Sequence, residues 1–447
     1  MIGRHLNEGW FRYRDRIALI QGNIRVTYGN IGRLLPSLVQ AWGELSKKRV
    51  GVCTISPMAF ATAVAALDLL QSHAFLVGPR SLEELARLKH VYAWDHILRE
   101  EDILAAGTQR EGSSSDSADG FGLVTILTSG TTGVPKAVNH SWNSLASPVR
   151  LDSRYSGTRW LLTYPLNLYA GTQVFLHAVL NWATLVIPTS VDPDTISRTL
   201  KDQRVTHASG TPTFWRQLLF WGPKEVLRDC ELEQITMGGE MATQELLDGL
   251  RATFPRARIV HIYASTELGR MFSVTDGREG FPARFLQEPP EKDIALRIVD
   301  GELVARGRHR MISYDRDSRI PEDAGGWIAT GDLVELCGDR VLFRGRRNDL
   351  INVGGRKVSP LQVESILRGL PGILDVRVYG KKSSMIGHLV AADVVLAPGV
   401  SEETANTELR QAVSGVLQPH EIPRIVRVVS KIASNEALKV VRSEDIT

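Results

Sequence analysis

The stretch LTSGTTGVPKA, residues 127–137, decides how this sequence is interpreted, because it combines small, hydroxylated and basic residues directly after an apolar run. Gly130 and Gly133 permit backbone conformations that a Cβ would forbid, so successive N–H groups can turn toward one anion. The hydroxyl residues around them add donors, and Lys136 adds a positive charge. Such a loop suits a polyphosphate, although a polar surface turn has a similar composition. The spacing does not fit G-x-x-x-x-G-K-[ST], which argues against a P-loop kinase or NTPase.

The composition is that of an ordinary globular protein without a strong charge bias. The chain has 447 residues, of which 43% are hydrophobic and 23% charged, and its formal net charge is +3. The length suggests roughly three domain-sized units, and the balanced charge gives no reason to expect a nucleic-acid partner. Cys53, Cys230 and Cys337 lie far apart without metal-ligand or redox spacing. This argues against a disulfide framework and predicts a reducing compartment, the cytoplasm.

No segment is predicted to target the chain to a membrane or to cross one. The first residues lack a continuous apolar run after a basic one, so we expect no signal peptide. The most apolar stretch, residues 160–188, is interrupted by polar residues and is interpreted as a strand, a helix and a strand in a core.

Short apolar runs alternate with helical patterns through most of the chain. RVGVCTI, residues 49–55, precedes the Ala-rich segment 58–70, and this pairing is typical of a βα unit in an open parallel sheet. Segment 107–122 is rich in Ser, Gly and Asp and is interpreted as a solvated linker or mobile loop. Farther on, GELVARG (301–307) and RVLFRGR (340–346) indicate hairpin strands with no helix between them. The last hundred residues or so follow a β–α–β–β–α pattern that predicts a separate small domain.

Further motifs follow the glycine-rich loop in a fixed order. They are MGGEMAT (237–243), IYASTELG (262–269), GWIATGDLVEL (326–336), FRGRRNDLINVGGRKVSPLQVE (343–364) and Lys439 near the end. Together with TSGTTGVPK, this series resembles the adenylate-forming superfamily, which contains acyl- and aryl-CoA synthetases, adenylation domains of peptide synthetases and luciferases. The resemblance covers essentially the whole chain, although the part before the glycine-rich loop is short for this superfamily.

The resemblance implies an α/β multi-domain fold. A large N-terminal adenylation domain, residues 1–344, is expected to contain stacked α/β subdomains and a small β-barrel-like part. A small mobile α+β domain, residues 345–447, is expected to act as a lid.

The resemblance also implies an ATP site formed by these motifs. The phosphate loop would contribute Thr128, Ser129, Gly130, Thr131, Thr132, Gly133 and Lys136. The remaining nucleotide-binding residues would be Gly238, Gly239, Glu240, Tyr263, Ala264, Ser265, Asp332 and Arg346.

Individual roles follow from the superfamily's motifs. Tyr263 would stack on adenine, Thr266 would contact the α-phosphate, and Glu267 would hold Mg²⁺, which prefers carboxylate and phosphate oxygens. Asp332 would accept hydrogen bonds from both ribose hydroxyls, and Arg346 would touch the ribose or a phosphate. Taken singly, each residue also has a structural interpretation, such as a turn aspartate or a solvated surface charge.

The chemistry implied by the resemblance has two steps. Lys439, Thr266 and Glu267 would be the catalytic residues of adenylation, with Lys439 bridging the carboxylate and the α-phosphate. The lid would then rotate about the hinge residue Asn348. This rotation would bring a loop with Gly354 and Gly355 to the thiol channel.

The acyl pocket is expected between three segments of the N-terminal domain. The predicted substrate-binding residues are Leu168, Tyr169, Gly171, Thr211 and Gly238. Amino-acid-activating relatives carry an Asp after the aromatic motif, and the segment NLYAGTQVF has none. We therefore expect a carboxylic acid without an α-amine.

Four positions depart from the superfamily's pattern. Asn348 stands where Asp or Lys is usual, Leu168 where His is usual, and Ala264 where Gly is usual. Leu438 stands where a glycine should let the lysine loop close onto the nucleotide, so adenylation could be weakened.

The predicted function is therefore ATP- and Mg²⁺-dependent activation of a carboxylic acid, followed by transfer to a thiol, with CoA as the leading acceptor. One alternative is the phosphopantetheine of an acyl carrier protein. Another is an enzyme that has lost adenylation and only forms the thioester from acyl-AMP. A non-catalytic binder of nucleotide or acyl-adenylate is a further alternative, which the retained motif residues oppose.

Overall fold

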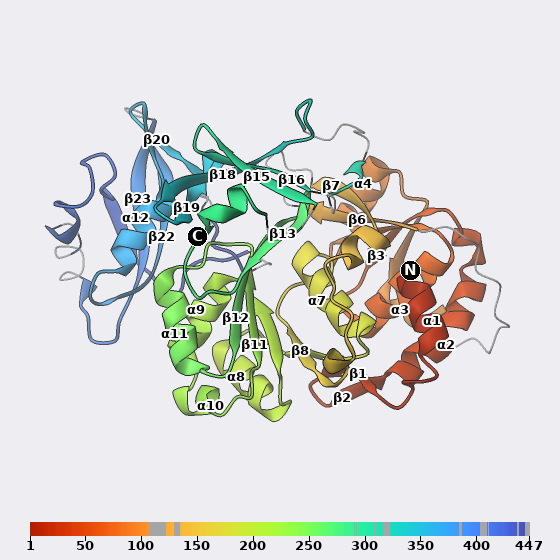
Figure 1. Cartoon of the computed structure of the whole chain (residues 1–447). Helices are drawn as coiled ribbons and strands as arrows, with labels where there is room; N and C mark the ends of the chain where they lie inside the picture. The colour runs from red at the N-terminus through yellow and green to blue at the C-terminus, as the bar shows by residue number, and fades with distance from the viewer. Residues whose placement is uncertain are drawn as a thin grey trace. The chain divides into compact units, whose positions relative to one another are not determined.

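The computed structural model describes residues 1–106, 122–128, 135–289, 291, 293–307, 310–315, 322–383, 387–402, 409, 411–435 and 438–442 (Figure 1). The chain divides into two compact units. The N-terminal unit comprises Met1–Gly277 with Gly307–Pro321, and the C-terminal unit comprises Arg278–Arg306 with Glu322–Thr447. The predicted boundary after residue 344 falls inside the C-terminal unit and stays a prediction. The predicted linker, 107–122, lies outside the described residues except for Gly122.

The first sheet of the N-terminal unit has the strand order β17-β7-β6-β4-β3-β5. Its strands are β3 (Arg49–Cys53), β4 (His73–Leu76), β5 (His96–Arg99), β6 (Leu123–Thr128), β7 (Lys136–Ser141) and β17 (Ser313–Tyr314). The helices of this region are α1 (Ile2–Gly9), α2 (Tyr28–Ala41), α3 (Pro57–Leu69), α4 (Leu82–Tyr92) and α5 (Glu100–Ala106). The predicted βα unit is confirmed as β3 and α3. The sheet is not wholly parallel, since β7 runs antiparallel to both β6 and β17.

The second sheet has the order β13-β12-β11-β10-β8-β9-β1-β2. Its strands are β1 (Ile17–Gln21), β2 (Ile24–Thr27), β8 (Arg159–Leu162), β9 (Thr184–Ile187), β10 (His207–Gly210), β11 (Gln234–Gly238), β12 (Arg258–Ser265) and β13 (Gly269–Val274). The associated helices are α6 (Trp142–Ala146), α7 (Tyr169–Leu180), α8 (Pro193–Asp202), α9 (Pro212–Trp221), α10 (Lys224–Arg228) and α11 (Gln244–Thr253). The apolar stretch 160–188 is confirmed as strand, helix and strand.

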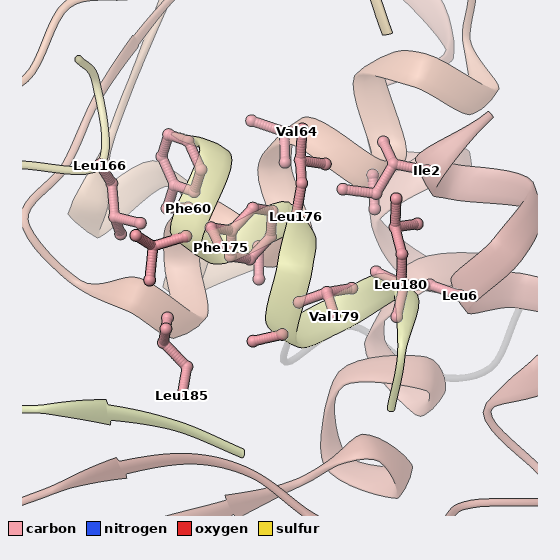
Figure 2. Close-up of a cluster of buried hydrophobic side chains, with 14 of the residues drawn as sticks. Ile2, Leu6, Phe60, Val64, Leu166, Phe175, Leu176, Val179, Leu180 and Leu185 are labelled. Atoms are coloured by element: carbon pink, nitrogen blue, oxygen red, sulfur yellow. The ribbon is translucent and has the colours of Figure 1, made fainter. Parts of the chain in front are cut away.

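One hydrophobic core joins the two sheets through helices α3 and α7. Both helices are buried on nearly all sides, which explains why their sequences are apolar without a polar face. Figure 2 shows their side chains pointing toward one another, and Phe60 meets Phe175 edge to face with ring centroids 5.3 Å apart. Leu76 of the first sheet and Leu185 of the second belong to the same core. The predicted stacking of α/β layers is therefore confirmed.

The C-terminal unit contains a five-stranded sheet, which corresponds to the barrel-like part that was predicted within the N-terminal domain. Its order is β14-β19-β18-β16-β15, with β14 (Phe281–Pro282), β15 (Ile294–Val299), β16 (Glu302–Gly307), β18 (Ile328–Cys337) and β19 (Arg340–Arg346). The predicted strands 301–307 and 340–346 both form. Strand β18 lies between them, so each pairs with β18 rather than with the other.

The rest of this unit is a small α+β layer, as predicted. Strands β20 (Ile351–Val353), β21 (Arg356–Val358), β22 (Ile373–Ser383), β23 (Gly387–Leu396) and β24 (Ile425–Val428) form one sheet, and α12 (Pro360–Arg368) packs on β22. None of the helices in the described part of the chain has both the length and the apolar character needed to cross a bilayer.

The N-terminal unit is expected to lose stability in mild acid because four of its histidines are buried or half-buried. Burial lowers the pKa of each to about 4: His73, His140, His177 and His207. In the unfolded chain these imidazoles titrate near 6.5, so unfolding takes up protons between these two values. The free energy of unfolding should therefore fall as pH falls from about 6.5 to about 4, by up to about 1.4 kcal/mol per pH unit for each histidine.

Urea unfolding at a series of pH values between 7 and about 4.5 measures this effect. The His207→Gln variant should show a shallower pH dependence than the wild type, whereas a variant of the exposed His96, His96→Gln, should match the wild type. Stability that stays constant or rises as pH falls below 6.5 would contradict the expectation.

Candidate active site

The predicted phosphate loop connects β6 and β7, two neighbouring antiparallel strands of the first sheet. Residues Ser129, Gly130, Thr131, Thr132 and Gly133 lie outside the described residues. Strand β6 ends at Thr128 and β7 begins at Lys136, and these two residues are register partners. The Thr128 hydroxyl donates to the Lys136 carbonyl at 3.4 Å. A strand follows the loop here, whereas a helix follows the loop of P-loop proteins, which agrees with the mismatch to that pattern.

Thr266 and Glu267 lie in the turn between β12 and β13. Ser265 and Gly269 are register partners at its base, Leu268 N donates to Ser265 Oγ at 3.0 Å, and Gly269 has φ +69°. Thr266, Glu267 and Leu268 are the three residues of this tight turn. The predicted α-phosphate and Mg²⁺ residues are thus adjacent in a well-defined turn.

Tyr314 links this turn to the base of the phosphate loop. Its hydroxyl donates to Glu267 Oε1 at 3.4 Å, and Lys136 Nζ lies 5.7 Å from its ring centroid. Burial, followed by the charge of Glu267, raises the pKa of Tyr314 to about 12, so the hydroxyl remains a donor at neutral pH. The structure therefore brings Lys136 and Glu267 to one place through a residue that the sequence did not single out.

His140 is a second residue that holds this turn. Its Nε2 donates to the Thr266 carbonyl at 2.7 Å, and its Nδ1 is 3.4 Å from the Ser144 hydroxyl. Lys136 and His140 are four residues apart on β7 and therefore face the same side of the sheet. This alternation was the only sequence signal for His140. The His140 ring also lies 6.2 Å from that of Tyr169.

The single carboxylate of this turn fits Mg²⁺ chemistry. Mg²⁺ usually keeps waters and takes only one or two protein carboxylates, with substrate phosphates supplying further oxygens. Within the described ranges, no group of three or more His, Cys, Asp or Glu side chains is placed to hold a metal ion. A cation here would therefore depend on Glu267 and the nucleotide together.

The residues predicted to contact adenine lie on β12 and at and just after the end of β11. Tyr263 stacks on its cross-strand partner Phe272 with centroids 5.1 Å apart, which orients the ring. A register shift between Tyr263 and Ala264 marks a bulge, a device that re-aims neighbouring side chains. Gly238 ends β11, and Gly239 has φ +85°, which requires a residue without a Cβ.

Two predicted site residues cap helix α9. Thr211 is fully buried, and its hydroxyl accepts from Phe214 N at 3.0 Å. Glu240 accepts from Thr213 N at 3.1 Å, where a carboxylate is favoured by the helix dipole. The structure thus gives both residues a capping role at one helix end. The contact of Thr211 with the substrate and the contact of Glu240 with the nucleotide stay predictions.

The remaining residues predicted to line the acyl pocket lie at the start of α7. Leu168 is the N-cap residue without a side-chain hydrogen bond, and Tyr169 begins the helix. Burial raises the pKa of the Tyr169 hydroxyl above its usual range, opposed by the charge of Arg270. A Cβ on Gly171 would lie 2.0 Å from the Pro165 carbonyl oxygen, so this glycine is needed for backbone packing whatever it does in the pocket.

Asp332 and Arg346 are brought together in the C-terminal unit. They are register partners across β18 and β19, and Arg346 Nε donates to Asp332 Oδ1 at 2.9 Å. The Asp332 side chain is 13% exposed and that of Arg346 is 60% exposed. Thr330 Oγ1 and Glu302 hold the backbone of the Thr-Gly-Asp turn by accepting from Asp332 N and Gly331 N.

The hinge and thiol-channel predictions fall on exposed turns of the same unit. Asn348 is exposed in the short 3₁₀ turn Arg347–Asp349. Gly354 and Gly355 have φ +57° and +87° and join the paired residues Val353 and Arg356. This is a two-residue type I′ hairpin turn, which needs positive φ at both positions. The hairpin therefore requires the glycines independently of any channel.

Lys439 follows a residue in the left-handed region. Leu438 has φ +56°, a conformation that costs a residue with a Cβ about 1–2 kcal/mol. Leu438 N donates to Asn435 O at 2.9 Å, Asn435 N donates to Lys439 O at 2.9 Å, and Ser434 pairs with Val440. The turn thus keeps the shape that glycine normally allows, with leucine in place of the glycine.

The chain after Lys439 is anchored in the core of the C-terminal unit. Arg442 donates to both oxygens of Glu364, at 3.0 and 2.8 Å, and Arg377 donates to the Val441 carbonyl. Burial alone would raise the pKa of Glu364, but Arg442 and Arg368 hold it below its usual range. The carboxylate is therefore charged and paired, so it ties the segment that carries Lys439 to helix α12.

We expect Leu438→Gly to relax this turn. The variant should gain up to about 1 kcal/mol of stability, because the favourable loss of strain exceeds the entropy cost of glycine. If Lys439 acts in adenylation, the acid-dependent exchange of pyrophosphate into ATP should also become severalfold faster. Leu438→Ala is the matched control, since it keeps the Cβ and therefore the strain. Equal melting temperatures and exchange rates for the two variants would contradict the prediction.

Two family models match this chain. The model described as AMP-binding enzyme matches residues 61–314, and the model described as AMP-binding enzyme C-terminal domain matches residues 362–439. A 2-succinylbenzoate–CoA ligase of Bacillus licheniformis is 28% identical, over 97% of this chain and 98% of that protein.

Solved structures share the fold. The o-succinylbenzoate CoA synthetase of Bacillus subtilis, in complex with the acyl-adenylate intermediate OSB-AMP, aligns with a TM-score of 0.74 at 21% identity, over 99% of this chain and 97% of that one. The anthranilate CoA ligase AuaEII, in complex with anthranoyl-AMP, aligns with a TM-score of 0.78 at 17% identity, over 98% and 95%. At these identities the likeness concerns the fold alone.

Proposed function

The chain belongs to the AMP-binding enzyme family, and on this premise we propose that it joins an aromatic carboxylic acid to CoA through an acyl-adenylate made from ATP. The membership confirms the predicted superfamily and the AMP-forming acid–thiol ligase class. The aromatic acid is proposed because the relatives named above act on 2-succinylbenzoate and anthranilate. It also agrees with the absence of an Asp after Tyr169 that would pair an α-amine.

The observation that supports the first step most strongly is the meeting of Lys136 and Glu267 at Tyr314. A carboxylate oxygen of the acid attacks the α-phosphorus of ATP, and the bond to pyrophosphate breaks. Both reactants are anions, so the site must supply positive charge where negative charge develops. When bound, Mg²⁺ would neutralise polyphosphate charge, with Glu267 as the residue that would hold it. Lys136 and Lys439 would supply the protein's own cations.

The second step needs no protein nucleophile. The CoA thiol loses its proton and attacks the acyl carbon, and AMP leaves. We propose that the lid, residues 345–447, turns at Asn348 between the two steps, and that the Gly354–Gly355 turn lies beside the pantetheine arm. We also keep the prediction of a cytoplasmic enzyme, which agrees with three free cysteines.

A second candidate function is favoured by one observation, the strained Leu438. If the cost of this conformation kept the turn from presenting Lys439 to the nucleotide, the chain would form thioesters from acyl-AMP without making acyl-AMP. The acceptor of either enzyme would present the same thiol arm, so a carrier protein remains an alternative to CoA.

Incubation of the purified chain with ATP, Mg²⁺, CoA and single acids tests the proposal. The panel should contain 2-succinylbenzoate, anthranilate, benzoate and medium-chain alkanoates, with products identified by mass spectrometry. We expect an acyl-CoA and equal amounts of AMP and pyrophosphate with at least one aromatic acid. Thioester formation from alkanoates alone would overturn the substrate class, and ADP as the nucleotide product would overturn the reaction.

A further inference from the structure

Residues 311–315, called the strap below, form a short segment beside the predicted phosphate and metal residues. Met311 N donates to the Glu267 carbonyl at 2.7 Å, and Ile312 N donates to the Asn139 carbonyl at 2.8 Å. Asp315 N donates to the Ala137 carbonyl at 2.8 Å. The strap therefore starts at the β12–β13 turn and runs along β7 toward Lys136.

Within the strap, Tyr314 is the residue whose side chain meets both charged groups. Its hydroxyl contacts Glu267 Oε1 at 3.4 Å, and its ring lies 5.7 Å from Lys136 Nζ. Among the described residues, Lys136 and Glu267 form no ion pair with each other. A direct ion pair between Lys136 and Glu267 would neutralise the two charges that a metal–polyphosphate ligand needs. The contacts of Tyr314 with both side chains keep the two charges apart.

The position of Tyr314 is fixed by its neighbours. Tyr314 pairs with Val138 in the antiparallel register of β17 and β7. The next residue, Asp315, has a side chain only 5% exposed and receives Arg49 Nη2 on both carboxylate oxygens at 2.9 Å. Arg49 is held in turn by the Tyr92 carbonyl, to which it donates at 2.8 Å. Because the donor and the acceptor are both charged and the pair is partly buried, this contact resists displacement.

We propose that Tyr314 is a positioning residue that orients the Glu267 carboxylate and holds Lys136 apart from it, so that both meet the same metal-bound nucleotide. The inference rests on the proposed function. The hydroxyl hydrogen bond fixes the rotation of the carboxylate and hence the direction in which it meets a cation. The ring supports the lysine by a cation–π contact.

Two variants separate the two contacts. Tyr314→Phe removes the hydroxyl and keeps the ring, whereas Tyr314→Leu removes both. Ser313→Ala is the matched control, because it lies on the same strand and loses only the hydrogen bond from Asn139 Nδ2 at 3.2 Å. Circular dichroism and melting curves establish that each variant is folded.

The first measurement is binding of Mn²⁺, as a spectroscopic substitute for Mg²⁺, to the chain with ATP, followed by electron paramagnetic resonance without any acid. Tyr314→Phe should weaken Mn²⁺ binding about three- to tenfold, which corresponds to the loss of one hydrogen bond of about 1 kcal/mol. Tyr314→Leu should also weaken ATP binding without metal by about threefold, as expected for a lost cation–π contact. Ser313→Ala should match the wild type in both.

Equal Mn²⁺ affinity in wild type, Tyr314→Phe and Ser313→Ala would overturn the inference. An equal loss in Tyr314→Phe and Ser313→Ala would also overturn it, because the strand and not the phenol would then be responsible. The inference would stand and the proposed function would fail if the wild type bound Mn²⁺ and ATP, Tyr314→Phe weakened that binding as predicted, and no acid were activated. A wild type that binds no Mn²⁺–ATP would overturn both.

Discussion

Lys439→Ala is expected to lower the rate of acid-dependent ATP–pyrophosphate exchange by about 100- to 1000-fold, the loss typical of removing one group that stabilises charge in a transition state. Lys439 supplies positive charge to the attacking carboxylate and the α-phosphate in the proposed first step. Its backbone is held on both sides, by Asn435 before it and by Val440 in the core after it. The loss should therefore appear mainly in kcat and not in the stability of the fold.

The second half-reaction provides the internal control. Lys439→Ala should still form a thioester from synthetic acyl-adenylate and CoA at a rate within a fewfold of the wild type. Lys431→Ala, a substitution at an exposed lysine of the same unit, should leave both half-reactions unchanged. If Lys439→Ala exchanged pyrophosphate at the wild-type rate, the lysine would have no part in adenylation.

Glu267→Gln is expected to lower exchange by about 100-fold and to raise the Mg²⁺ concentration needed for half-maximal exchange, because a charged metal ligand is replaced by a neutral one. The amide keeps the size of the side chain and can still accept a hydrogen bond from Tyr314. The fold should therefore be retained, and a melting curve will show whether it is. Exchange rates measured across a magnesium titration give both quantities.

The control for this variant is Glu245→Gln, which removes an exposed carboxylate on α11. It should behave as the wild type at every magnesium concentration. An unchanged magnesium dependence in Glu267→Gln would remove this residue from the metal site.

Local patterns in the sequence predicted the elements well, because each was encoded by neighbouring residues. The run 49–55 with segment 58–70 and the stretch 160–188 became β3–α3 and β8–α7–β9. Strand pairing was less predictable. The two predicted hairpin strands, β16 and β19, each pair with β18, but the sequence analysis did not name their partner, because antiparallel partners depend on the whole sheet.

Among the residues of the candidate site, those within one motif were also easier to predict than those that the fold brings together. Residues inside contiguous motifs, such as Thr266 and Glu267, were identified from the order of the motifs. Tyr314 and His140 were not, because their contacts with Glu267 and Thr266 join segments far apart in sequence. The sequence also marked Leu438 as a departure, but only the backbone angle shows that leucine adopts the glycine conformation.

Some predicted site glycines have a structural role that sequence reasoning did not foresee. Gly354 and Gly355 form a type I′ turn, and Gly171 allows α7 to approach the Pro165 carbonyl. The buried pair of Arg442 with Glu364 was equally hidden, because a charged residue is expected at the surface until its partner is known.

Acid-dependent exchange of labelled pyrophosphate into ATP, measured with Mg²⁺ and without CoA, tests the central claim most directly. We predict exchange with at least one aromatic acid and none without an acid, since the exchange reports reversible formation of acyl-AMP. A folded protein that shows no exchange with any acid of the panel, yet converts a synthetic acyl-adenylate and CoA to the thioester, would contradict the claim that this chain adenylates its substrate.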